Sequence, residues 1–161
     1  MTEIKRKRAK LGDVIEIPVS QGYAYAHYTH HDRNLEYGAL LALLPGIFAE
    51  RPTDWQDVVT QQELYWFFLP LNPELRRGHV AIVANELIPE SRQKFPLLRR
   101  AGWRDRDGTV LKWWLWDGEK SWKIDKLNPE QHHLSLASVW GFELLVLRIE
   151  EGWMPSDIKS A

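Results

Sequence analysis

One stretch near the start of the chain, GDVIEIPVSQGYAYAHYTHHD (residues 12–32), restricts the possible folds more than any other. Ile15 and Ile17 alternate with polar positions, which is the period-2 pattern of a half-buried β-strand. The following SQG provides a turn, because its glycine can adopt a positive φ. Alternation resumes in YAYAHYTH, where the small Ala24 and Ala26 share one face. The stretch predicts an antiparallel hairpin against which a neighbouring layer packs closely.

Short apolar runs and turn signals continue along the chain and predict five to seven strands. The further strands are expected within residues 38–48, 64–71, 79–84 and 110–125, the last as a hairpin turning at Asp117-Gly118. Residues 85–96 contain two prolines and predict a loop.

Two helices are expected near the C-terminus. Asn128 is a candidate N-cap, with Pro129 at the first helical position. In FELLVLRIEEGW, Leu144 and Leu147 have helical spacing and Gly152 is placed as a C-terminal cap. The predicted fold is therefore α+β and mainly β: a strongly twisted antiparallel sheet or partly open barrel, with a short helix and a C-terminal helix.

The 161 residues are expected to form one domain over residues 11–161, preceded by a basic flexible arm over residues 1–10. The arm carries Lys5, Arg6, Lys7, Arg8 and Lys10. A formal net charge of −1 disfavours nucleic acid as a partner, and no apolar run is long enough for a membrane span. The chain has no Cys and its N-terminus lacks the apolar segment of an export signal, so we expect a cytoplasmic protein.

The sequence predicts no enzyme, no cofactor and no metal site. His27 and His30 are expected on opposite faces of one strand, so that with His31 they act as polar caps and not as metal ligands. Ser135 and Ser138 lack the Gly-x-Ser-x-Gly turn of a nucleophile, and no glycine-rich phosphate loop is present.

The segment LKWWLWD is the strongest candidate for a binding surface. If Leu111, Trp113 and Leu115 face the core, Trp114 and Trp116 occupy the other face of the strand. A second layer of the protein covers these two residues, or a partner does, since Trp is enriched among interface hot spots. The candidate partner-binding residues are Trp114, Trp116, Asp105, Asp107, Asp117 and Glu119, because carboxylates around Trp anchors suit a basic partner.

Several motifs resemble, in the same order along the chain, the immunity protein 26 family of bacterial polymorphic toxin systems. They are KLGDVIEIPVSQGYAYAHY, RRGHVAIVANELIPESRQKFP, WDGEKSWKI and LSLASVWGFELLVLRIEEGW. The second departs from the family pattern, because His79 stands where an aromatic residue such as Trp is expected.

The resemblance implies a cytoplasmic immunity protein that neutralises a cognate polymorphic or contact-dependent toxin. It implies that the protein binds the C-terminal toxic domain and occludes it, without chemistry of its own. The alternative from the residues is a β-barrel module that binds nucleic acid through the basic arm and exposed aromatic faces.

Overall fold

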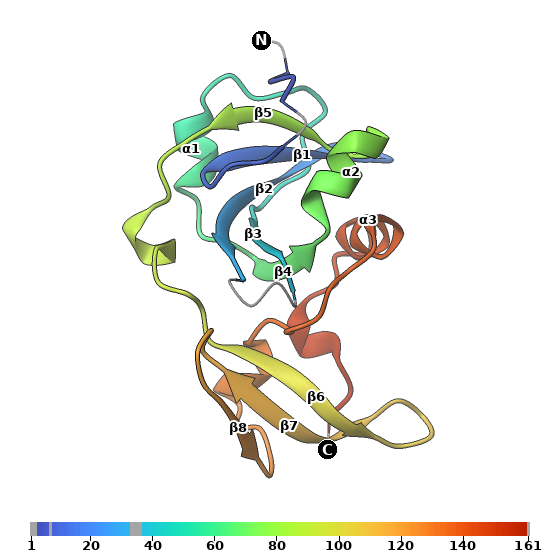
Figure 1. The fold of residues 1–161 in the computed structure, drawn as a ribbon. Coiled ribbons are helices and arrows are strands. Elements are labelled where there is room, and N and C mark those ends of the chain that lie inside the picture. Colours follow the sequence, from blue (N-terminus) through green and yellow to red (C-terminus); the bar gives the residue numbers. More distant parts are fainter. Residues whose placement is uncertain (1–2, 7, 33–36, 161) are drawn as a thin grey trace.

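The structure is a computed structural model that describes residues 3–6, 8–32 and 37–160. Within these residues it contains two antiparallel sheets and three α-helices (Figure 1). The strands are β1 (Asp13–Val19), β2 (Gly22–His31), β3 (Ala39–Leu43), β4 (Tyr65–Leu69), β5 (Ala81–Asn85), β6 (Leu98–Arg104), β7 (Val110–Trp116) and β8 (Ser121–Ile124). The helices are α1 (Trp55–Val59), α2 (Leu71–Arg77) and α3 (Phe142–Glu151), with single 3₁₀ turns at η1 (Glu90–Arg92), η2 (Glu130–His133) and η3 (Pro155–Asp157).

The larger sheet has the strand order β4-β3-β2-β1-β5 and is not closed into a barrel. Its centre is the predicted hairpin, in which Ile17 pairs with Ala24 and Ile15 pairs with Ala26. Gly22 has a positive φ, as predicted, and a Cβ there would clash with the carbonyl of Phe48. The mainly β fold class is therefore confirmed, in its open-sheet form.

Helices cover both faces of the larger sheet. Ala24 and Ala26 lie on the face that packs against α2 and α3, in one core with Leu75, Leu145 and Ile149. The other face packs against α1 at one end and against the start of β6 at the other. In Figure 1, α2 and α3 accordingly lie on one side of the larger sheet and α1 on the opposite side.

The smaller sheet has the order β6-β7-β8 and extends from one end of the molecule (Figure 1). The β7–β8 hairpin turns at Asp117-Gly118, as the sequence predicts. The described residues contain eight strands, whereas the sequence predicts five to seven, because β6 was not expected. Its sequence, LRRAGWR, does not alternate cleanly, and register shifts at Ala101/Trp103 and Trp103/Arg104 explain why.

The helical predictions need three corrections. α1 and α2 were not expected, because helices of five and seven residues are too short for a clear periodicity. The short helix after Asn128 is the 3₁₀ turn η2, whose N-cap position is Pro129. Asn128 still caps the turn, because its Oδ1 accepts the backbone N–H of Gln131 at 2.9 Å. In α3 the buried residues are Leu145 and Ile149, whereas Leu144 and Leu147 are exposed, although Gly152 does cap the helix in the left-handed conformation.

The described part of the basic arm contacts the domain. The backbone N–H of Ile4 donates to β5 at 2.7 Å, and the guanidinium of Arg6 forms a 2.8 Å ion pair with the buried Asp13. The first two residues and Lys7 lie outside the described residues, and the flexibility of the arm stays a prediction. No helix in the described ranges has the length and apolar character needed to cross a bilayer.

Candidate binding surfaces

The central strand of the smaller sheet has two different faces. Trp113 and Leu115 point to the inner face and are buried, whereas Trp114 and Trp116 point to the opposite side of the sheet and are half-buried. The expected alternation is therefore correct over these four residues. It is wrong for Leu111, which is 38% exposed, because the register shift between Trp103 and Arg104 interrupts the alternation at that point.

Trp116 lies at the junction between the two sheets. Its ring centroid is 5.0 Å from Tyr37, 5.2 Å from Phe95 and 6.0 Å from Phe68 of β4. The larger sheet thus covers much of Trp116. This matches the first of the two alternatives stated above, in which a second layer of the protein covers this residue. A role for Trp116 in partner binding stays a prediction.

Trp114 lies beside charged and exposed neighbours on the same side of the smaller sheet. Cross-strand pairing places it between Arg100 of β6 and Lys123 of β8, and places Trp103 opposite Lys112. We define these five residues, Arg100, Trp103, Lys112, Trp114 and Lys123, as the outer face. The side chain of Trp103 is 65% exposed, the largest exposed fraction of any described Trp.

Sequence reasoning missed Trp103, although a signal for it exists. Asp107-Gly108 is a second tight-turn dipeptide, like Asp117-Gly118, and indicates that the residues before it pair with β7. That pairing alone would have placed Trp103 and Arg100 beside the Trp-rich strand.

The four predicted carboxylates lie at opposite ends of β7, which is about 20 Å long. Asp105 and Asp107 belong to the β6–β7 turn, where both accept hydrogen bonds from the backbone N–H of Thr109. Asp117 accepts the backbone N–H groups of Glu119 and Lys120 at 2.9 and 2.7 Å.

Hydrogen bonding with Asp105, and then with Thr109, lowers the pKa of Asp107, and the backbone N–H groups of Lys120 and Glu119 lower the pKa of Asp117. Three of the four carboxylates therefore build turns, and only the side chain of Glu119 has no turn-forming bond among those described.

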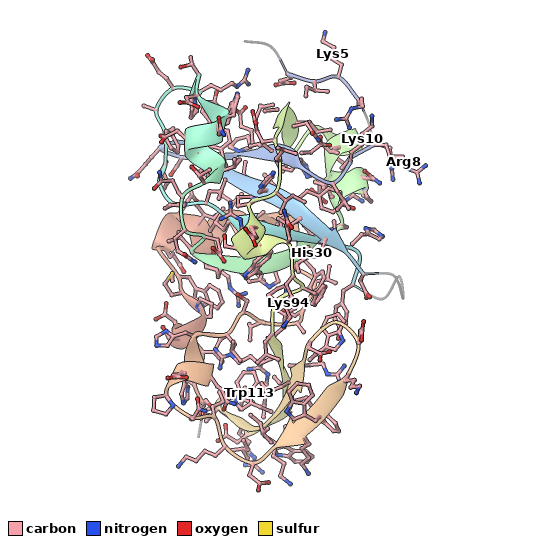
Figure 2. All side chains as sticks on the ribbon, turned by 90° about the vertical axis from the view of Figure 1, so that its left-hand side faces the viewer. Lys5, Arg8, Lys10, His30, Lys94 and Trp113 are labelled. Atoms are coloured by element: carbon pink, nitrogen blue, oxygen red, sulfur yellow. The ribbon has the colours of Figure 1, made fainter. Side chains whose placement is uncertain are left out.

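A groove of about 920 Å³ lies at the junction of the two sheets. The end of β2 contributes His30 to its wall, the connection before β6 contributes Lys94 and Phe95, and the β7–β8 turn contributes Asp117 and Glu119. Figure 2 shows His30 and Lys94 between the larger sheet and the part of the molecule that holds Trp113. The groove therefore combines two predicted partner-binding residues, Asp117 and Glu119, with His30, Lys94 and Phe95, which the sequence did not predict at the same site.

The histidines of β2 are arranged differently from the expectation. A register shift between Tyr28 and His30 lets His27 pair with Ala42 and His30 pair with Leu40, so both imidazoles lie on one face and not on opposite faces. His27 Nε2 donates to the carbonyls of Gly12 and Glu86 at 2.9 and 3.1 Å.

His30 is also held by its neighbours. Its Nε2 donates to the Gln93 carbonyl, and its Nδ1 accepts from Thr29 Oγ1, both at 2.9 Å. Burial lowers the pKa of His27 and of His30, so both are neutral at pH 7. No cluster of three or more metal-ligating side chains occurs among the described residues.

Other polar groups that could carry chemistry have structural partners. Ser135 Oγ accepts the backbone N–H of Trp66 at 2.8 Å, and Ser138 Oγ accepts the indole N–H of Trp140 at 3.2 Å. The buried Glu16 carboxylate pairs with Arg51 at 2.7 Å and accepts the hydroxyl of Tyr25 at 2.8 Å. These hydrogen bonds and this ion pair connect separate segments of the fold.

Comparison with known proteins finds no matching family model, no matching curated protein and no matching solved structure.

Proposed function

We propose that the protein is a cytoplasmic immunity protein, which binds the toxic domain of a cognate polymorphic or contact-dependent toxin and occludes it. The resemblance to the immunity protein 26 family supports this class of function. Its first motif forms the β1–β2 hairpin, and its last includes α3, which packs on that sheet. The side chains best suited to chemistry are engaged in structural hydrogen bonds, which supports binding over catalysis.

The junction groove is the observation that carries the proposal. It combines a carboxylate, Glu119, a cation, Lys94, and the aromatic ring of Phe95, drawn from segments far apart in the sequence. A concave surface with charges of both signs suits a protruding loop of a folded partner. A stable interface of about 1,600 Å² would extend from the groove across Trp116 and onto the neighbouring surface of the larger sheet.

Neutralisation assays test this proposal. The probe is the purified C-terminal toxic domain of the proposed cognate toxin, mixed with increasing amounts of the protein. Occlusion predicts that inhibition of the toxin is complete at a 1:1 ratio and that the complex survives gel filtration. Complete inhibition by far less than one molecule of the protein per molecule of toxin would indicate catalytic inactivation of the toxin. The absence of any complex would refute the proposal.

Charge reversal then tests the groove. Glu119→Lys together with Lys94→Glu should weaken toxin binding at least about tenfold, because both exposed charges face the proposed partner. Glu151→Lys is the matched control, since Glu151 is an equally exposed carboxylate in the last turn of α3, where a cation is well tolerated. If the wild type, the double variant and Glu151→Lys bind the toxin with equal affinity, the toxin binds a surface other than the groove.

A further inference from the structure

We propose that the outer face of the smaller sheet binds single-stranded nucleic acid, with nucleobases stacked on Trp103 and Trp114 and phosphates held by Arg100, Lys112 and Lys123. The proposal goes beyond toxin neutralisation and does not depend on it. It differs from the alternative drawn from the sequence, which combined a β-barrel with the basic arm. Lys5, Arg8 and Lys10 lie at the opposite end of the molecule from Trp113 and the smaller sheet (Figure 2).

Strand pairing places a cation beside each indole of the outer face. Trp114, in the central strand, has Arg100 as its partner on one side and Lys123 on the other, and Trp103 has Lys112. The guanidinium of Arg100 is 5.9 Å from the ring centre of Trp114. Gly102 lies beside this ring, where a Cβ would be in ordinary contact with Trp114 Cδ1 at 3.5 Å and in tighter contact with the carbonyl oxygen of Lys112 at 3.1 Å.

The outer face is exposed and positively charged. Trp103, Arg100, Lys112 and Lys123 are all exposed, and no residue of this set is acidic. Residues 97–126 contain eight Lys and Arg against five Asp and Glu, although the whole chain has a net charge of −1. The charge balance of the chain therefore conceals a basic region, which also contains five of the nine Trp residues.

The chemistry of the two rings favours nucleobases over an acidic protein surface. The face of an aromatic ring carries the negative part of its quadrupole and therefore repels carboxylates, whereas a base stacked on it with an offset gains dispersion contacts and buries apolar surface. Stacking of one base on an aromatic side chain contributes about 1 to 3 kcal/mol of binding free energy, and it occurs with every base because each has a π-face. The three cations would neutralise phosphates beside the stacked bases.

The spacing of the rings favours a single strand over a duplex. Trp103 and Trp114 are diagonal neighbours on adjacent strands, a relation that separates the residues themselves by about 7 to 8 Å in a regular antiparallel pair. Stacked nucleotides in a duplex rise by about 3.4 Å, roughly half of this distance. Only an extended strand with unstacked bases can place successive bases on both rings.

Fluorescence titration tests the proposal with defined probes: fluorescein-labelled oligo-dT and oligo-rU, a DNA duplex, and an oligoglutamate peptide of equal charge. We expect the single strands to bind and the duplex and peptide to bind at least about tenfold more weakly. Three phosphate contacts predict that affinity for the single strands falls about 20-fold between 50 mM and 200 mM salt.

Variants locate the binding. Trp103→Ala should weaken oligo-dT binding about tenfold, because one stacked base is lost. Trp122→Ala is the matched control, since Trp122 is 41% exposed but pairs with Leu115 on the inner face of the same sheet. Lys112→Glu should weaken binding, whereas Lys126→Glu, an exposed lysine beyond β8, should not.

Three results would overturn the proposal. They are no binding of either oligonucleotide at 50 mM salt, equal effects of Trp103→Ala and Trp122→Ala in folded protein, and peptide binding as tight as oligo-dT binding. The last result would assign the outer face to an acidic protein. None of these results bears on neutralisation of the toxin, which is measured separately with the groove variants.

Discussion

His27 shows how a buried polar residue links segments that are distant in the sequence. Its side chain is completely buried, and one imidazole N–H bridges the carbonyls of Gly12, which directly precedes β1, and Glu86, which directly follows β5. The imidazole thus connects the start of β1 to the end of β5. Burial of the imidazole lowers its pKa and thereby favours the neutral form in the folded protein.

At the residue scale we predict that the protein loses stability as the pH falls below about 6.5. Burial lowers the pKa of His27 in the folded state, so between its folded and unfolded pKa values the unfolded chain binds more protons. The free energy of unfolding must then decrease with decreasing pH in that interval. Urea denaturation at pH 7.5 and pH 5.5 measures the difference.

The variant His27→Gln should reduce this pH dependence, because an amide keeps a donor but does not titrate. His133→Gln is the control, since His133 is exposed. His30 contributes in the same direction, because burial lowers its pKa too. An unchanged pH dependence in His27→Gln would assign the effect to other groups.

At the element scale, consecutive outward positions of β7 have different roles. Trp116 contacts aromatic rings of the larger sheet and of the connection before β6, whereas Trp114 lies two positions earlier among cations. A single strand thus contributes to the junction between the sheets and to a candidate binding face.

We predict that Trp116→Ala lowers the free energy of unfolding by about 3 kcal/mol, because it leaves a cavity between two packed layers. Trp114→Ala should cost less than about 1 kcal/mol, since part of its ring already contacts solvent. Denaturant titrations of both variants measure the difference. Similar losses would mean that the junction does not depend on Trp116.

At the scale of the whole molecule, Arg99 connects the smaller sheet to the C-terminal region. Its buried guanidinium donates to the carbonyls of His132 and Leu134, both at 2.9 Å, and of Pro155 at 2.6 Å. It also stacks 4.4 Å from the ring centre of Trp113. Burial lowers the pKa of Arg99 to about 10, so the group stays charged at pH 7.

We predict that Arg99→Met destabilises the protein by at least about 2 kcal/mol, because one buried and two partly buried carbonyls lose their donor. Arg100→Met, at the adjacent exposed position, should change stability by less than about 0.5 kcal/mol. If residues 11–161 are one domain, far-UV circular dichroism and Trp fluorescence should report the same transition in the wild type. Separate transitions would show that the two sheets unfold independently.

The amino-acid sequence by itself determined the elements whose signals are local. Alternation on both sides of SQG specifies the β1–β2 hairpin, Asp117-Gly118 specifies the β7–β8 turn, and Gly152 specifies the end of α3. In each case the relevant interactions join residues within a few positions, so composition and spacing are sufficient to predict them.

Only the tertiary structure decided which faces are buried and which residues meet. Register shifts place His27 and His30 on one face and remove Leu111 from the core, and the packing of α3 buries Leu145 instead of Leu144. The outer face and the junction groove likewise combine residues from separate segments. The physical reason is that a bulge or a buried helix face depends on contacts with distant parts of the chain, and a one-residue change in register moves a side chain to the opposite face of a sheet.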